Sequence, residues 1–401
     1  MLFARTIFLA SSLFAGSIRG TPVASTTYPI PSIITPYNKT SPEYYTGDLQ
    51  HSDFEVHEVL DWGHLEDYNN EYTLDRDGGG SCSLSNRTFW WFDDTIVSQS
   101  GSFRGFTSNS VALVLNISHA GWLRDISASS TYGIFNAIPF TEEEAEINTS
   151  IFTRYGIWTF TDCVVLSDTT AVHFWDVVQF TAGADIGPEA VHRGTTMAMY
   201  TLDPDSNELT VTREEQYYYT TEQYAYGAFA NVVVNGIAYL YALDGKYSDR
   251  QDVHLASAPV SELTDKSSWR YYDAASGTWS STQPSPSERN ASAAVISNSM
   301  PFSSGNIYYS EYHNQYLLVF FNNYVDNRFR VLSAPTPAGP WSTGNKVLFD
   351  TPQGVFYNYG AQSTPVYYQT DGDIPGKNLM LAFTYPDVGW KYPRAFKLKF
   401  E

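Results

Sequence analysis

Short runs of apolar and aromatic residues, separated by polar turns, recur along most of the chain. Each copy has one run, a polar turn and a second run, as in "GGSCSLSNRTFWWFDDT", which begins at Gly79. The other copies begin at Asp162, Ala228, Asn306 and Ala361. The Asn-Gly pair at 235–236 is the strongest hairpin signal among them. The pattern therefore predicts five pairs of antiparallel strands.

The five copies follow one another at intervals of 63 to 83 residues, counted between their second strands. A further apolar strand follows in each copy, from "VALVLNI" in the first to "RAFKLKF" in the last. A period of ~70 residues with three or four strands is typical of the blade of a β-propeller. We therefore predict an all-β, five-bladed β-propeller over residues 51–401. The weak helical pattern at 141–147 is interpreted as a turn within a loop.

The first copy brings acidic residues together at the open end of its hairpin. If the turn is centred on Asn86-Arg87, Asp94 lies opposite Gly79. Asp77 is two positions further along, or roughly 7 Å along the strand and ~5 Å across it. The glycines after Asp77 would let the backbone approach a ligand closely. Acids at strand ends also cap turns, which is the alternative interpretation.

A second acidic pair is predicted in the second copy, where a turn near Asp168-Thr169 places Asp162 opposite Asp176 or its neighbour. Cleavage of a glycosidic bond usually takes two carboxyl groups, one as general acid and one as nucleophile or base. Asp77 and Asp94 are the catalytic candidates. Asp94 is favoured as the acid, because its aromatic flank "FWWF" could raise its pKa by desolvation. Asp162 and Asp176 would complete the site or hold the substrate.

Aromatic residues near the strand ends are candidates for stacking on sugar rings. Trp158 precedes Asp162, and Tyr226 follows a tyrosine-rich run, although tyrosines at alternate positions also serve as ordinary strand packing. Tyr359 and Gln362 lead into the fifth copy in the same way.

The chain has 43 acidic and 23 basic residues, a formal net charge of −20. Nucleic acid and anionic membranes are disfavoured as partners for such a surface, because both recruit Lys and Arg. Neutral polysaccharides remain open, and an aromatic fraction of 16% suits both strands and sugar stacking. The eight histidines show no zinc-ligand spacing, so no cofactor is expected. A structural calcium in an acidic central channel is the one alternative. We expect a monomer.

Residues 1–20 have the pattern of a secretory signal peptide, with cleavage as late as residue 24. Residues 21–50 are rich in Pro, Ser and Thr and are expected to form an extended leader. Sequons begin at Asn38, Asn86, Asn116, Asn148 and Asn290, as in a secreted glycoprotein. Cys82 and Cys163, in neighbouring copies, could form one disulfide in that oxidising setting.

The motifs "RDGGGS…FWWFDDT" and "YHNQYLLVFFNN…RVLSAPTPAGPWS" resemble a family of secreted five-bladed propellers that includes endo-D-arabinanases. That resemblance covers nearly all of 55–401 and implies that Asp77 and Asp94 are catalytic. The chain departs from the family pattern at Asp93, where Gly is usual, which bears on the substrate more than on the pair.

The hypothesis is therefore a secreted glycoside hydrolase that acts on a neutral or furanose-containing polysaccharide. The alternatives are a non-catalytic glycan-binding propeller and an arabinanase, xylosidase or invertase type of hydrolase with another substrate. A lyase, with Tyr226 or a histidine as the base, is a third class.

Overall fold

The structure is a computed structural model of the 401-residue chain. It describes residues 23–29, 43–44, 54–67, 72–115, 122–129, 133–134, 136–181, 189–244, 251–286, 291–297, 302–322, 326–343, 346–355, 358–364, 373–387 and 390–401. The expected signal peptide, most of the expected leader and the sequons at Asn38, Asn116 and Asn290 lie outside these residues.

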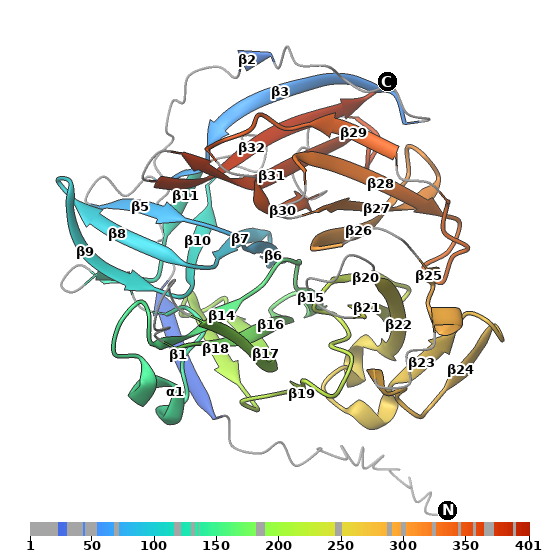
Figure 1. The fold of residues 1–401 in the computed structure, drawn as a ribbon, viewed down its shortest axis with the longest axis horizontal. Coiled ribbons are helices and arrows are strands. Elements are labelled where there is room, and N and C mark those ends of the chain that lie inside the picture. The colour runs from blue at the N-terminus through green and yellow to red at the C-terminus, as the bar shows by residue number, and fades with distance from the viewer. Residues whose placement is uncertain are drawn as a thin grey trace, which may run out of the picture.

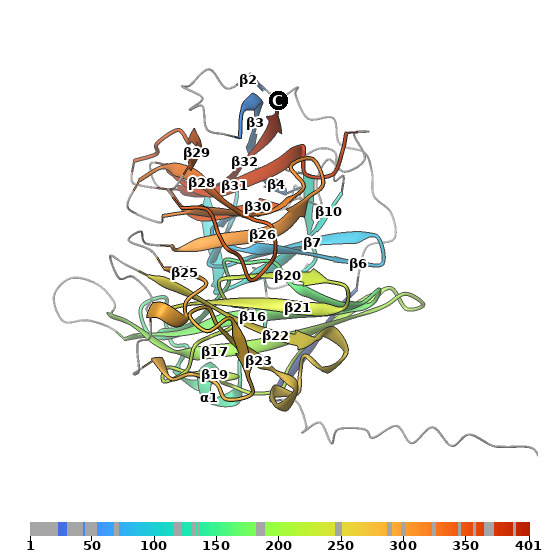
Figure 2. The same cartoon turned by 90° about the vertical axis from the view of Figure 1, so that its right-hand side faces the viewer.

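In the described part of the chain, five mainly antiparallel sheets form a ring around a central axis, and the prediction of an all-β, five-bladed propeller is confirmed (Figure 1). Their innermost strands lie nearest the middle of the ring in Figure 1. Figure 2 shows the same ring from the side, where β7, β16 and β21, the second strands of the first three blades, run across the molecule.

The strands of each blade follow one another from the innermost outward. Blade one contains β6 (Gly80–Leu84), β7 (Arg87–Phe92), β10 (Ser110–Val114), β11 (Trp122–Asp125) and β4 (Glu66–Asp67). Blade two contains β15 (Val164–Ser167) and β14 (Arg154–Trp158), both paired with β16 (Thr170–Thr181), then β17 (Glu189–Asp203), β18 (Glu208–Arg213) and β1 (Ala24–Pro29), with β19 (Tyr219–Thr220) beside β17.

Blade three contains β20 (Ala230–Val234), β21 (Ile237–Leu243), β22 (Asp252–Pro259), β23 (Arg270–Asp273) and β24 (Thr278–Ser280), with β25 (Ile296–Ser297) beside β22. Blade four contains β26 (Ser304–Ser310), β27 (Gln315–Phe321), β28 (Arg328–Ala334) and β29 (Lys346–Asp350). Blade five contains β30 (Tyr359–Thr364), β31 (Asn378–Asp387), β32 (Trp390–Phe400), β3 (Val56–His64) and β2 (Glu43–Tyr44).

The first long strand and the last strand of residues 51–401 meet in blade five. Strand β3, from the N-terminal part, pairs with the C-terminal β32 and so closes the ring. Strand β1 pairs with β18 along the outer edge of blade two. Part of the segment expected to be a leader is therefore strand.

Two insertions stand outside the regular blades. The first is a three-stranded sheet of β5 (Thr73–Arg76), β8 (Thr95–Gln99) and β9 (Ser102–Thr107). The second follows the small hairpin of β12 (Ala128–Ser129) and β13 (Gly133–Ile134) and contains helix α1 (Glu142–Ile147). Short 3-10 turns occupy Val260–Glu262, Lys266–Ser268 and Ala291–Ala293.

Helix α1 corrects the expectation of a loop turn at 141–147. The Thr141 side chain accepts a bond from the Glu144 amide, and the Glu144 carboxylate accepts one from the Thr141 amide. This reciprocal capping box satisfies two amides that the first turn leaves unpaired. The sequence "TEEE", in which Glu144 follows Thr141 by three positions, is the pattern of such a capping box.

The core consists of five apolar clusters, one at each boundary between neighbouring blades. Between blades one and two, Trp91 stacks on Tyr200 with ring centroids 4.1 Å apart. The disulfide between Cys82 and Cys163 joins the same two blades, with Cα atoms 5.2 Å apart. Disulfides are typical of proteins that fold in an oxidising compartment.

Candidate active site

Asp77 and Asp94 lie directly opposite each other at the open end of the β6–β7 hairpin. The turn consists of Ser85 and Asn86, whose φ angles are +45° and +61°. Two left-handed residues make a two-residue hairpin turn, which shifts the pairing by two residues from the register expected for a turn at Asn86-Arg87. Leu84 therefore pairs with Arg87 rather than with a later residue.

Backbone bonds extend this pairing beyond the strands. The Asp77 amide donates to the Asp94 carbonyl (3.2 Å), and the Asp93 amide donates to the Asp77 carbonyl (2.8 Å). The register is the same on both sides of this stretch, because Arg76 pairs with Thr95 and Gly80 pairs with Trp91. These contacts bring all three aspartates to one place.

The glycines after Asp77 are required by close packing. A Cβ on Gly79 would lie 1.8 Å from the Trp91 carbonyl oxygen, and one on Gly80 would lie 1.8 Å from that of Thr161. Gly78, at φ +57°, passes against the Asp93 side chain. The glycines let the chain run between β7 and the start of blade two.

Asp94 is held by two side chains from β14. Arg154 Nη2 donates to its Oδ2 (2.7 Å), and Trp158 Nε1 donates to its Oδ1 (3.0 Å). Gly156 lies between these donors, and a Cβ there would come within 2.9 Å of the Trp158 ring. The alternation Arg-x-Gly-x-Trp thus places both donors on one face of the strand. The Asp94 side chain remains 21% exposed.

Asp77 is held from blade five, because the Tyr359 hydroxyl donates to its Oδ2 (2.7 Å). Asp77 is only 7% exposed, and Tyr359 is 8% exposed. The centre therefore opens to solvent mainly on the side of Asp94.

Asp93 is the third aspartate of the acidic centre, which consists of Asp77, Asp93 and Asp94, and it is buried. Burial, and then the negative charge of Asp77, raise the pKa of Asp93 well above its usual range. The Thr159 amide donates to its Oδ1 (2.8 Å). The centre thus combines a buried carboxyl that favours its proton with the Asp94 carboxylate held by Arg154. Sequence reasoning assigned Asp93 no role and did not consider Arg154, although the "RYGIW" alternation around Trp158 offered a signal.

Asp162 lies in the central channel. Its Oδ1 accepts bonds from the Ser81 amide (2.7 Å) and hydroxyl (2.8 Å), and Asn306 Nδ2 donates to its Oδ2 (3.1 Å). Asn306 also donates to Gln362 Oε1 (3.2 Å), and Asn231 Nδ2 donates to the Asp162 carbonyl (2.7 Å). Burial raises the pKa of Asp162 to about 6. This polar ring links all five blades, and Gln362 is buried within it.

Asp162 and Asp176 are not brought together, so the predicted pair is wrong. A bulge in the β15–β16 ladder shifts the register, and β14 instead pairs Trp158 with Asp176. Asp176 accepts from Thr195 Oγ1 (3.1 Å) and lies 3.3 Å from His192 Nε2. Its side chain shares a sheet face with Trp158, because directly opposed residues of neighbouring strands do so.

Tyr226 is a further correction, because it is buried (1% exposed) and cannot stack on a substrate. Its ring packs against Tyr224 and Tyr271 in the apolar cluster between blades two and three. Burial raises the pKa of Tyr226 above its usual value, which disfavours the phenolate that a lyase base would need.

The two described sequons differ in exposure. Asn86 is exposed at the tip of the β6–β7 turn, whereas Asn148 is half-buried and its Oδ1 accepts a bond from the Tyr155 amide (2.6 Å). In the described part of the chain, no group of three or more His, Cys, Asp or Glu is placed to hold a metal ion. Nor do those residues include a helix that is long and apolar enough to cross a membrane.

Several solved structures share the fold. A candidate hydrolase from Bacteroides ovatus is 15% identical, with a TM-score of 0.60 over 89% of this chain and 93% of that one. The catalytic domain of an α-L-arabinofuranosidase of glycoside hydrolase family 62 from Coprinopsis cinerea is 10% identical, with a TM-score of 0.42 over 86% and 97%. A family 43 enzyme from Xanthomonas citri is 10% identical, with a TM-score of 0.40 over 83% and 88%. At these identities the likeness concerns the fold alone.

No functionally curated protein matches the sequence. The relation to endo-D-arabinanases stays a prediction. One family model does match, over residues 67–371, and the chain therefore belongs to the family described as "Domain of unknown function (DUF5005)".

Proposed function

We propose that the protein is a secreted glycoside hydrolase of neutral polysaccharides, with Asp77 and Asp94 as its pair of catalytic carboxyl groups. The observation that carries the proposal is their placement directly opposite each other, with a separate set of donors for each carboxylate. Hydrolysis of a glycosidic bond needs two carboxyl groups in different protonation states on either side of the bond.

The surroundings of the two residues favour different roles. Asp94 accepts from a guanidinium and an indole N–H, contacts that an ionised carboxylate makes, and its side chain reaches solvent. It suits the nucleophile or general base. Asp77 then takes the remaining role of general acid, which a glycosidase pair requires. This assignment reverses the sequence-based preference, because Arg154 offsets the desolvation expected from "FWWF".

D-arabinan is the first substrate to test, because the blade-one motif resembles endo-D-arabinanases. The Bacteroides ovatus protein with the same fold is also described as a candidate hydrolase. Secretion accords with the signal-like N-terminus and the Cys82–Cys163 disulfide.

The test is release of reducing ends from D-arabinan, L-arabinan and xylan by the wild type and by Asp77→Asn and Asp94→Asn. Each substitution should lower kcat at least ~1000-fold, as removal of a catalytic group does. Asp168→Asn is the control, because Asp168 is an exposed acid in the β15–β16 turn. Full activity in either site variant would remove that residue from the mechanism. Retention of a glycan without any product would favour the non-catalytic binding propeller.

A further inference from the structure

A pocket of about 390 Å³ lies between the two insertions of the propeller. One wall is the end of β9 with the residues that follow it, including Phe106 and Ser108. The other wall comes from the second insertion, and it includes Asn136, Phe140 and, from helix α1, Ala145. The pocket is therefore built by elements that the blades do not need for their own pairing.

Arg154 connects this pocket to the acidic centre of Asp77, Asp93 and Asp94. Its side chain lines the pocket and is buried, and its Nη2 donates to Asp94. The guanidinium lies over the rings of Phe106 (4.6 Å to the centroid) and Phe180 (4.3 Å). A molecule in the pocket would thus be separated from Asp94 by a single side chain.

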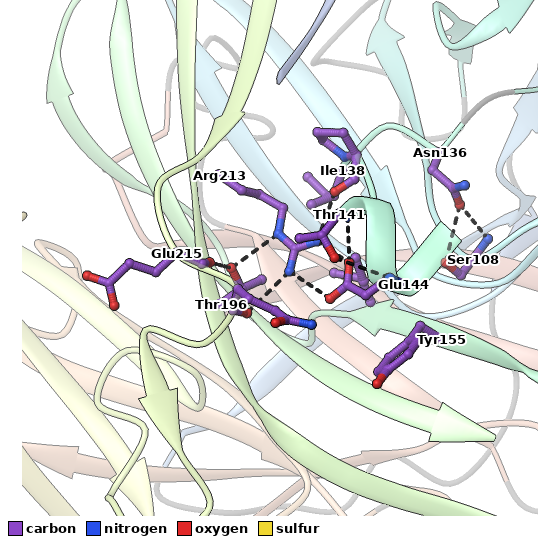
Figure 3. A network of polar contacts seen from close by, with 12 residues as sticks. Ser108, Asn136, Ile138, Thr141, Glu144, Tyr155, Thr196, Arg213 and Glu215 are labelled. Atoms are coloured by element: carbon purple, nitrogen blue, oxygen red, sulfur yellow. Dashed lines mark hydrogen bonds and ion pairs between the residues drawn. The ribbon is translucent and has the colours of Figure 1, made fainter. Parts of the chain in front are cut away.

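The α1 wall is held rigidly against blade two (Figure 3). Arg213 of β18 donates to Glu144 of α1 through Nη1 (2.6 Å) and Nη2 (3.1 Å), and both side chains are fully buried. Arg213 Nη1 also donates to the Pro139 carbonyl (2.9 Å). A buried bidentate pair fixes geometry more than it adds stability. The pocket is therefore preformed rather than assembled by a loose loop.

The two walls are also tied to each other. Asn136 Oδ1 accepts a bond from the Ser108 amide (3.0 Å; Figure 3). It also accepts one from Thr107 Oγ1 (2.6 Å), so the second insertion is joined to the end of β9. The width of the pocket is thus set by direct bonds between its sides.

The lining suits a neutral ligand with both apolar and hydroxyl surfaces. Phe106, Phe140 and Tyr155 offer aromatic surface, and Ser108 and Ser150 are polar. Arg154 is the one charged side chain among the described residues that line the pocket, and Asp94 neutralises it. A protein with a formal charge of −20 would repel an anionic polymer. Sugar rings present one apolar face and several hydroxyls, and this combination of aromatic and polar groups recognises them.

We propose that this pocket is a binding subsite for a neutral sugar residue of a polysaccharide, placed beside the reacting bond by the Arg154–Asp94 contact. The subsite deepens the proposed function, and its role in positioning a substrate depends on that function. Binding in the pocket can be measured without catalysis.

The experiment fills the pocket from α1. Ala145 and the adjacent Glu146 are both exposed, but only Ala145 lines the pocket, so Ala145→Trp and Glu146→Trp form a matched pair. Both are made in an Asp77→Asn background, so that bound glycan is not cleaved. Retardation is measured in native gels containing D-arabinan, xylan or the anionic polygalacturonate.

The expected result is retardation of Asp77→Asn by a neutral glycan but not by polygalacturonate. Ala145→Trp should raise the apparent dissociation constant for that glycan at least tenfold, and Glu146→Trp should leave it unchanged. Equal retardation of the two Trp variants, or none by either neutral glycan, would overturn the proposal. If Ala145→Trp does not fold, as judged by circular dichroism, Thr149→Trp at another lining position replaces it.

The subsite and the proposed function can fail separately. Selective loss of binding in Ala145→Trp, with no cleavage of any glycan by the wild type, would support the subsite and reject the hydrolase. Cleavage by the wild type, with identical KM and products for Ala145→Trp and Glu146→Trp, would support the hydrolase and reject the subsite.

Discussion

Arg154 donates a hydrogen bond of 2.7 Å from Nη2 to Oδ2 of Asp94, across the boundary between blades one and two. Sixty positions separate the two residues in sequence, and Arg154 is 7% exposed whereas the Asp94 side chain is 21% exposed. The bond couples the acidic centre to the neighbouring pocket, because the same guanidinium belongs to both.

We predict that Arg154→Met lowers kcat by roughly 10- to 100-fold, because a bond to a charged group contributes about 1.5–3 kcal/mol. Arg154→Lys should recover only part of the loss, since an ammonium lacks the planar fork that also stacks on Phe180. Steady-state kinetics on a glycan that the wild type cleaves measures both. A kcat within twofold of wild type in Arg154→Met would show that Asp94 does not need this partner.

Asp93→Asn should retain most of the activity, in contrast to Asp94→Asn. The raised pKa of Asp93 means that its neutral form is favoured, and an amide resembles that form. Because the folded state holds this proton more tightly than the unfolded chain, the wild type should lose stability relative to Asp93→Asn as the pH rises above the unfolded pKa. Urea unfolding at several pH values, with parallel assays, tests both points. Loss of activity equal to that of Asp94→Asn would assign Asp93 a direct role.

Asp162 should make stability depend on pH in a defined window. Its pKa rises from 3.8 to about 6 in the folded protein, so between these values the folded state binds a proton that the unfolded chain has lost. Its contribution to stability is fully present below the unfolded pKa of 3.8 and is lost as the pH rises through about 6. The free energy of unfolding of the wild type, relative to Asp162→Asn, should therefore fall by about 2 kcal/mol between about pH 4 and about pH 7. Parallel profiles for the two proteins would contradict this assignment.

Gly80→Ala should destabilise the protein by about 1–3 kcal/mol, because the added methyl overlaps the backbone of blade two at Thr161. Gly105→Ala is the matched control, since a Cβ added there would have no atom within 4 Å and the φ of Gly105 is not in the left-handed region. Thermal or denaturant unfolding compares the two. An equal effect at both glycines would show that blade two moves away easily.

Glycan occupancy should be higher at Asn86 than at Asn148. Asn86 is exposed at a hairpin tip, whereas Asn148 is half-buried, lines the pocket and accepts a bond from Tyr155. A glycan on Asn148 would compete with a ligand in that pocket. Glycopeptide mass spectrometry of protein from a eukaryotic secretory host measures the occupancy of each sequon. Full occupancy at Asn148 together with undiminished glycan binding would contradict the subsite proposed above.

The strand–turn–strand repeat could be predicted from the chain because its causes are local. Alternation of apolar residues and Asn-Gly at a turn act through near neighbours, and the pattern of strands and turns indicated the five blades and the closeness of Asp77 to Asp94. The register at Asp77 was missed by two residues, because the turn depends on which residues adopt positive φ, and Ser85 does so here.

By itself, the sequence determined the blades, their number and the hairpin that carries the acids, since each follows from periodicity and turn chemistry over a few residues. Only the tertiary structure decided that Arg154 faces Asp94, that Asp162 belongs to the central channel rather than to Asp176, and that Tyr226 is core. Those outcomes depend on contacts between blades and on a bulge in β15–β16. Packing between distant segments sets such contacts, and no short stretch of sequence contains both partners.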